Sequence, residues 1–120
     1  MSTFMLLLFD DPTEYATMSP AELQAVVARY SAWADRLGAE GKMRGAEKLR
    51  DEGGRVLRRE QGALVVKDGP YAEVREIISG YFLLEAADYD EAVALASSCP
   101  HADSRGSMML RAIEDTSGHG

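Results

Sequence analysis

The sequence predicts an α+β domain whose elements follow the order strand, helix, hairpin, strand, helix, strand. Three observations lead to this prediction: a continuous apolar run from Phe4 to Phe9, a second one from Ile77 to Ala86, and two segments with helical periodicity. With 120 residues, 46% hydrophobic and 28% charged, the chain has the length and composition of one globular domain. We expect this domain to cover residues 1–114 and residues 115–120 to form a disordered tail.

The first strand and the first helix have clear signals. The apolar run from Phe4 to Phe9 shows no polar alternation, which favours a strand buried on both faces. Ser19, Pro20 and Glu22 then predict a helix start with a capping box, and Gly38 or Gly41 is expected to end the helix. The apolar stripe of this helix consists of Leu23, Val26, Val27, Tyr30, Ala34 and Leu37, with Trp33 at its edge.

The middle of the chain contains a predicted β-hairpin. Arg55–Arg59 and Ala63–Lys67 flank Glu60-Gln61-Gly62, where glycine suits the turn. Residues 42–53 give no clear signal, and Met43–Leu49 is either a short strand or an irregular crossover.

The last third contains a strand, a helix and a strand. After the apolar strand, Asp88 is expected to cap a helix with Glu91 three positions on, and Pro100 to end it. Ser107–Glu114 is predicted to be the last strand. The apolar stripe of the second helix consists of Ala92, Leu95, Ala96 and Cys99. This order fits a ferredoxin-like βαββαβ fold, with the hairpin or the unclear segment supplying an extra strand.

The two apolar strands carry a further implication. In the ferredoxin-like order they are the central strands, and two helices can cover only one face of the sheet. Because Phe4–Phe9 and Tyr81–Leu84 are apolar at successive positions, the second face also needs to be covered. We therefore predict a homodimer with the two sheets face to face.

Charge and motifs exclude several functions. The net charge of −7 argues against nucleic-acid binding, and no segment has the length of a signal peptide or a membrane span. One cysteine, Cys99, permits no intrachain disulfide, which suits the cytoplasm. We expect no cofactor, because the chain lacks a P-loop and a dinucleotide-binding fingerprint. We also expect no metal, because Cys99, His101 and Asp103 lack the spacing of a zinc site.

Asp68-Gly69-Pro70 has two interpretations. These residue types make a good turn after a strand. Alternatively, Asp68 faces a cleft near Tyr71, Glu73 and Glu76, where paired carboxylates could divide acid and base roles.

Glu85 is expected on the face of the sheet opposite Phe82 and Leu84, which should pack under the helices. A carboxylate there needs a partner, and Arg111 of the last strand could supply one. Both a structural ion pair and a ligand contact are open for Glu85.

The segment from Asp68 to Glu76 resembles the DGPF-A-E-x-K-E signature of the DGPF branch of YCII-related proteins, with Tyr71 for Phe and Arg75 for Lys. Gly80–Glu85 resembles the strand that follows this signature. The similarity spans about residues 3–114; its weaker parts are Met5–Leu8, Gly45–Leu49, Asp90–Ala92 and Cys99-Pro100.

The resemblance implies a dimeric α+β barrel built on a ferredoxin-like protomer. Some YCII-related proteins carry a His on the first helix, paired with an Asp and proposed as an acid–base site. The first helix of this chain, Pro20 to Gly38, contains no His. DGPF-type proteins are also associated with extracytoplasmic-function sigma factors, which implies a regulatory or ligand-sensing role for the family.

Two functional hypotheses follow. The first is a small-molecule-binding or regulatory domain with a pocket between the sheet and the first helix and Asp68 at its mouth. The expected ligand-binding residues are Tyr30, Trp33, Tyr71, Tyr81 and Glu85. The second is an enzyme that uses Asp68 or Glu76 as acid or base on a small metabolite, with Tyr30 assisting.

Overall fold

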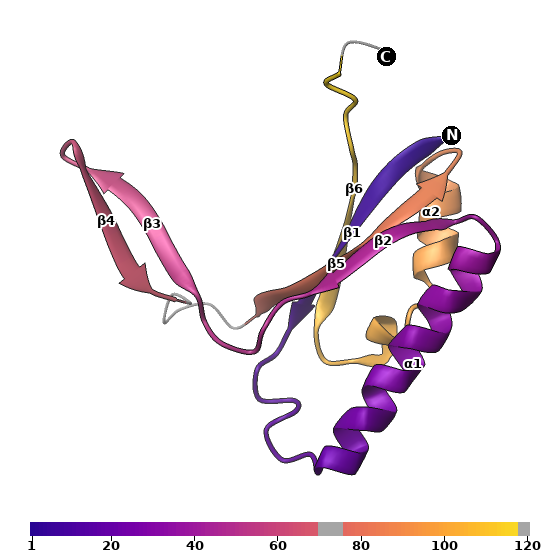
Figure 1. The fold of residues 1–120 in the computed structure, drawn as a ribbon, viewed down its shortest axis with the longest axis horizontal. Helices are drawn as coiled ribbons and strands as arrows, with labels where there is room; N and C mark the ends of the chain where they lie inside the picture. Colours follow the sequence, from indigo (N-terminus) through magenta and orange to yellow (C-terminus); the bar gives the residue numbers. More distant parts are fainter. Residues whose placement is uncertain (70–75, 118–120) are drawn as a thin grey trace.

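The computed structural model of the chain describes residues 1–69 and 76–117. Its elements, in chain order, are β1 Ser2–Asp10, α1 Pro20–Ala39, β2 Met43–Lys48, β3 Arg55–Glu60, β4 Ala63–Asp68, β5 Ile77–Ala86, α2 Tyr89–Ala96, the 3₁₀ turn η1 Pro100–Asp103, and β6 Ser107–Ala112 (Figure 1). The predicted α+β order is confirmed. The unclear segment after α1 is a strand, and the last strand ends two residues earlier than expected.

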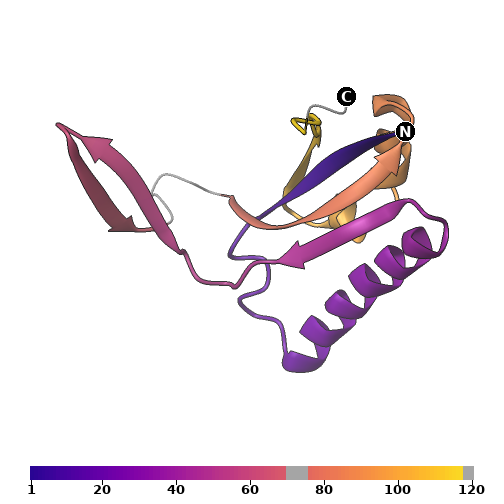
Figure 2. The ribbon, with the colours of Figure 1, turned by 45° about the horizontal axis from the view of Figure 1, so that its top comes forward.

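Four strands form one antiparallel sheet in the order β2-β5-β1-β6. This is the ferredoxin-like arrangement, with the two apolar strands in the centre as predicted. The hairpin β3–β4 is a separate two-stranded sheet inserted between β2 and β5. Figures 1 and 2 show that it projects away from the four-stranded sheet.

The core lies between the sheet and the two helices. Alternate residues of the central strands are buried there, among them Leu6, Leu8, Phe82 and Leu84. The Trp33 ring packs edge-on against Phe82 with ring centroids 4.9 Å apart. Burying these large side chains on one face is the main favourable contribution to folding.

The apolar stripe of α1 differs from the prediction in one respect. Trp33 was expected at its edge, but it lies in the core, whereas Leu23 and Val27 are exposed. The first turns of α1 extend past the sheet, so helical periodicity alone did not show which part of the stripe would be covered (Figure 1).

The predicted helix starts are confirmed. Ser19 and Glu22 form a reciprocal capping box, with both hydrogen bonds 3.1 Å long. The Asp88 side chain accepts a hydrogen bond from the Glu91 amide at 2.9 Å. The helix α1 ends at Ala39, and Gly41 follows with a φ of 71°, a conformation that favours glycine.

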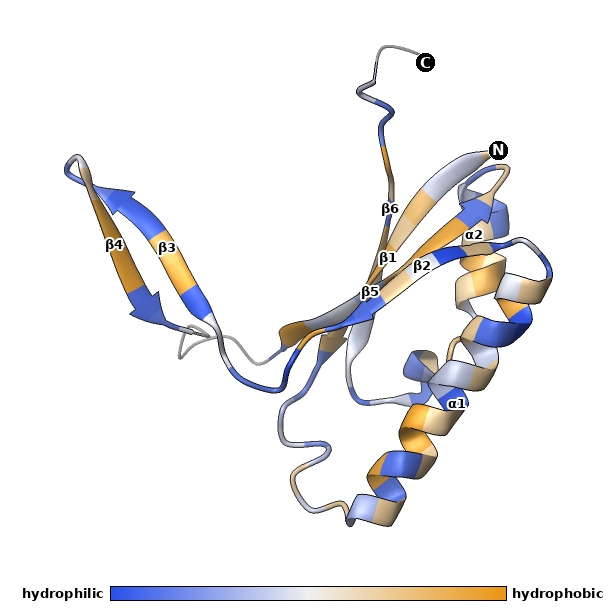
Figure 3. Ribbon diagram, viewed as in Figure 1, coloured by the Kyte–Doolittle hydropathy of each residue, from blue (hydrophilic) through white to orange (hydrophobic). Residues whose placement is uncertain are grey.

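The face of the sheet away from the helices is apolar at its centre. Met5 and Leu7 of β1 lie beside Leu83 and Tyr81 of β5, and these four residues alternate with the core residues. Figure 3 shows hydrophobic colouring along β1 and β5. No helix of the described ranges covers this face. Within the same ranges, no helix combines the length and hydropathy needed to cross a membrane.

Candidate functional site

A buried histidine joins three elements at one end of the sheet. His101, in η1, is 1% exposed and is the one buried polar residue among those the structure describes. Its Nδ1 lies 2.8 Å from the Tyr30 hydroxyl of α1. Its Nε2 lies 2.8 Å from the carbonyl oxygen of Phe9 in β1. The imidazole therefore fixes η1 between the first helix and the end of the first strand.

These contacts assign the proton positions. A carbonyl oxygen can only accept, so Nε2 of His101 carries the proton and donates to Phe9. In the neutral ring Nδ1 then accepts the proton of the Tyr30 hydroxyl.

Asp10 follows Phe9 in β1 and places a carboxyl beside the imidazole of His101. Its Oδ1 lies 3.6 Å from Nε2 of His101, and its side chain is 15% exposed. Burial raises the pKa of Asp10 above its usual value, although the nearby His101, Ser79 and Lys48 oppose this shift. The ammonium group of Lys48 is committed to an ion pair with Asp51 at 2.9 Å.

The loop after β1 adds Glu14 and Tyr15. The Tyr15 side chain interacts with both Tyr30 and the carboxyl of Glu14. Burial raises the pKa of both phenols, so both are protonated at neutral pH. Glu14 accepts a hydrogen bond from the Arg105 amide at 3.0 Å through Oε2. Its Oε1 is buried without a hydrogen-bond partner in the described part of the chain. The Glu14 charge also contributes to the raised pKa of Asp10.

We refer to Asp10, Glu14, Tyr15, Tyr30 and His101 as the His101 cluster. The Tyr30 hydroxyl and Nε2 of His101 donate within the protein, whereas Oε1 of Glu14 accepts no hydrogen bond from the residues that the structure describes. A buried acceptor without a donor is costly. The cluster is therefore suited to a molecule that brings hydroxyl or ammonium donors, and its phenol–imidazole chain could carry a proton.

Comparison with known proteins places the chain in a family. The model of the YCII-related domain matches residues 2–117. The chain belongs to the YCII-related family. An uncharacterized protein of Rhizobium meliloti (strain 1021) is 29% identical over 112 residues, which cover 92% of this chain and 90% of that protein. This YCII-related domain has no His on its first helix. Instead, His101 of η1 lies beside Asp10 of β1.

The predicted ligand-binding residues of this YCII-related domain lie on two sides of the sheet. Tyr30 belongs to the His101 cluster, and Trp33 lies in the core, where its Nε1 donates to Ser98 at 2.8 Å. Tyr81 and Glu85 point to the opposite face of the sheet. The structure does not bring these four together in one pocket. Tyr71 lies outside the described residues.

Glu85 has partners other than the one expected. It accepts hydrogen bonds from the Thr3 hydroxyl and, at 3.2 Å, from Arg44 of β2. The Thr3 bond, followed by that of Arg44, lowers the pKa of Glu85. Arg111, the expected partner, lies in β6 opposite Met5. The expected partner Arg111 was wrong because the sequence did not identify β2 as the strand beside β5, whereas an ion pair at Glu85, one of the two open interpretations, is present.

The predicted catalytic acids lie apart from the His101 cluster. Asp68, at the end of the hairpin, is 89% exposed and pairs with Arg55 at 3.4 Å. Glu76 accepts a hydrogen bond from the Ser107 hydroxyl at 2.9 Å, where β5 and β6 begin. Residues 70–75, which carry most of the family signature, lie outside the described ranges.

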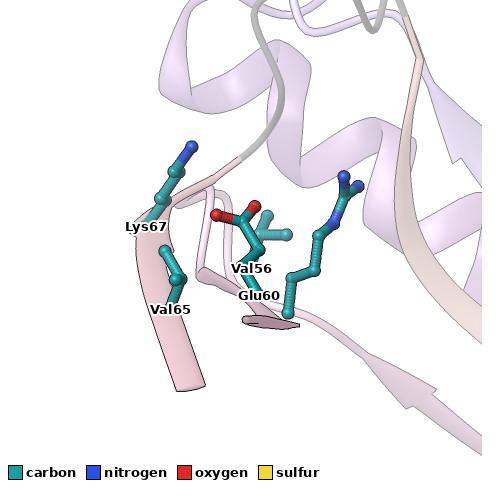
Figure 4. A pocket seen from close by; sticks show the side chains of 5 residues that line it. Val56, Glu60, Val65 and Lys67 are labelled. Atoms are coloured by element: carbon teal, nitrogen blue, oxygen red, sulfur yellow. The ribbon is translucent and has the colours of Figure 1, made fainter. Parts of the chain in front are cut away.

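Two other possible sites are limited. A hollow on the hairpin, lined by Val56, Arg58, Glu60, Val65 and Lys67, holds about 30 Å³, which is room for one water molecule (Figure 4). No three His, Cys, Asp or Glu side chains of residues 1–69 and 76–117 are grouped closely enough to bind a metal. Burial also raises the pKa of the Cys99 thiol, which disfavours the thiolate that a metal would need.

From the sequence, His101 was paired only with Cys99 and Asp103. The predicted pairing of the first and last strands contained the information needed to find its other neighbours. In an antiparallel β1–β6 pair the end of the first strand lies beside the start of the last one, as Phe9 does beside Ser107. The predicted topology could therefore have placed Asp10 near the segment before β6, although the sequence analysis did not pair them.

Proposed function

We propose that this YCII-related domain binds a small molecule rich in hydroxyl or amino groups at the His101 cluster. The observation that carries the proposal is the buried Oε1 of Glu14, which has no hydrogen-bond partner among residues 1–69 and 76–117 and lies near the carboxyl of Asp10. Two carboxylates without committed cations repel anionic ligands and favour cations or neutral donors. The phenols of Tyr15 and Tyr30 add apolar faces against which such a molecule could pack.

Proton transfer is a second candidate function. It is favoured by the chain from Tyr15 through Tyr30 to the imidazole of His101, since a proton accepted at Nδ1 can be balanced by one that leaves Nε2 toward the Asp10 carboxyl 3.6 Å away. Catalysis by Asp68 gains little support by comparison, because its carboxylate is exposed and paired with Arg55. Glu76 has a neutral hydroxyl partner and lies outside the cluster.

The homodimer belongs to the same proposal. Packing the Met5, Leu7, Tyr81 and Leu83 face against a second copy would complete a dimeric α+β barrel and bury the second face of the central strands. The DGPF branch and a link to a sigma factor are predictions that rest on the motif at the end of β4 and on the expected family association. A cytoplasmic location is a prediction that rests on the single cysteine, Cys99.

Thermal shift against matched sets of amines, polyols and organic acids tests the ligand site. Wild type should be stabilised by amines or polyols, and this stabilisation should be lost in Asp10→Asn and in Glu14→Gln. Asp68→Asn is the matched control, since it removes an exposed carboxylate outside the cluster. The proposal is wrong if only the organic acids stabilise the protein, or if both cluster variants retain the effect.

A further inference from the structure

The hairpin β3–β4 is an arm that packs closely against none of the other helices and strands that the structure describes. Its strands pair with each other, and neither packs closely against the sheet or the helices that the structure describes. Figures 1 and 2 show it standing clear of them in both views. The radius of gyration is accordingly 16.6 Å, against about 14 Å for a compact domain of this length.

One face of this arm is apolar and exposed. Leu57 and Val66 lie directly opposite each other, and Leu64 lies on the same face. Their exposed fractions are 60%, 54% and 54%. A two-stranded hairpin without further cover is marginally stable in water. The exposed aliphatic face therefore indicates that a protein surface covers it.

The charge of the arm indicates which surface. Residues 55–68 contain four basic and two acidic side chains and carry a net charge of +2. Because the whole chain carries −7, the rest of the chain carries −9. The arm is basic and the body from which it projects is strongly acidic. Two arms would repel each other, whereas an arm and the body of another copy attract.

We propose that the arm packs its Leu57, Leu64 and Val66 face on the body of a second copy of this chain. The apolar face distinguishes this contact from nucleic-acid binding, which the acidic body also opposes. In a two-fold symmetric dimer the same contact forms twice, so each arm is covered by the body of the other copy. The inference does not rest on the ligand site.

The arm can be removed without disturbing the body. The amide of Gly69 donates to the carbonyl of Gly54 at 3.0 Å, so the two ends of the arm already meet. Joining Gly54 to Gly69 deletes residues 55–68, which pack closely against no other described helix or strand. A second variant, Leu57→Asn with Leu64→Asn and Val66→Asn, keeps the arm and changes only its apolar face. The matched control, Val27→Asn with Val93→Asn, changes similarly exposed residues on α1 and α2.

Sedimentation equilibrium measures the dimer dissociation constant of wild type and of each variant. We expect wild type to be a dimer, the deletion and the triple variant to weaken it at least tenfold, and the control to leave it unchanged. Raising the salt concentration from 0.05 to 0.5 M should weaken wild type more than the deletion variant. A monomeric wild type, or a deletion variant that dimerises as tightly as wild type, overturns the proposal.

Hydrogen exchange gives a second readout in wild type: arm amides protected only at dimer concentrations support docking, and equal protection after dilution to monomer overturns it. The dimer and the ligand site are measured separately. Failure of the arm proposal would leave the ligand thermal shift unchanged, and failure of the ligand-site proposal would leave the dimer dissociation constants unchanged.

Discussion

The hydroxyl of Tyr30 lies 2.8 Å from Nδ1 of His101, and this bond joins two residues 71 positions apart in the chain. It connects the middle of α1 to the turn before β6. Through the other nitrogen of the ring, the connection continues to the carbonyl of Phe9 at the end of β1. One imidazole thus sets the position of the first helix relative to two strands, and it forms the base of the candidate ligand site.

Tyr30→Phe should destabilise the fold by about 1–3 kcal/mol, because it leaves the buried Nδ1 of His101 without a donor. Urea unfolding monitored by circular dichroism measures this free energy. The matched control is Tyr89→Phe, which removes a hydroxyl that bonds the Ala112 amide at an exposed position where water can replace it. Equal costs for the two variants would contradict the structural role of the Tyr30 hydroxyl.

Asp10→Asn should become more favourable relative to wild type as the pH rises from about 4 to 7. Burial raises the native pKa of Asp10 above its usual 3.8, so the folded protein holds this proton to a higher pH than the unfolded chain does. Its contribution to stability is therefore lost as the pH rises through the native pKa. Urea unfolding at several pH values measures the unfolding free energy of both proteins. The value for Asp10→Asn minus the value for wild type should increase with pH, and a decrease would contradict the prediction.

Glu85→Gln should show the opposite dependence. The Thr3 hydroxyl and Arg44 lower the native pKa of Glu85 below its usual 4.5, so its contribution to stability is present above that value and lost as the pH falls through the native pKa. The wild-type advantage over Glu85→Gln should therefore disappear in acid. The same urea titrations test this, and an advantage that persists at the lowest pH would rule out the Thr3–Glu85–Arg44 contacts as its source.

The sequence predicted those parts of the fold that local signals specify. The capping box of α1, the Gln61-Gly62 hairpin turn and the continuous apolar strands each depend on neighbouring residues, and each was found. The strand β2 was unclear because most of its side chains are exposed at a sheet edge, so it lacks an apolar alternation.

The candidate site was mostly missed for a different reason. Tyr30 was selected, but its partners come from β1 and η1, which only the tertiary arrangement brings together. The acidic residues near the family signature were more conspicuous, yet Asp68 lies on an exposed hairpin. Sequence patterns record burial and turns well, whereas a polar cluster assembled from single residues of three elements leaves no periodic trace.

Leu83→Ala and Leu84→Ala should separate the two faces of β5. Leu84 is fully buried under the helices, so its truncation should cost about 2–5 kcal/mol at any protein concentration. Leu83 points to the open face, and if that face packs on a second copy its truncation should cost most at concentrations where the dimer forms. Thermal unfolding over a hundredfold range of concentration measures both. A cost for Leu83→Ala that does not vary with concentration would argue against sheet-to-sheet dimerisation.

Gly106→Ala should disrupt the His101 cluster from the outside. A Cβ at this position would collide with the carbonyl oxygen of Phe9 and would lie 2.9 Å from Nε2 of His101, the two groups that share a hydrogen bond. Because one of the obstructing atoms is backbone, the segment before β6 has to move, and we expect the imidazole to lose its bond to Phe9. The destabilisation should reach about 1–3 kcal/mol, the range expected for a lost buried hydrogen bond.

Gly38→Ala is the matched control for this substitution. A Cβ at Gly38 would have no atom within 4 Å, and Gly38 lies in the last turns of α1, so alanine should stabilise the protein by about 0.5–1 kcal/mol. Urea unfolding gives both free energies, and the imidazole NMR signals of His101 report whether its environment has changed. Gly106→Ala with wild-type stability and an unchanged His101 signal would show that the ring does not depend on the close approach of Gly106 to Phe9. A disturbed His101 signal in Gly106→Ala alone would show that this glycine keeps the space in which the imidazole meets the first strand.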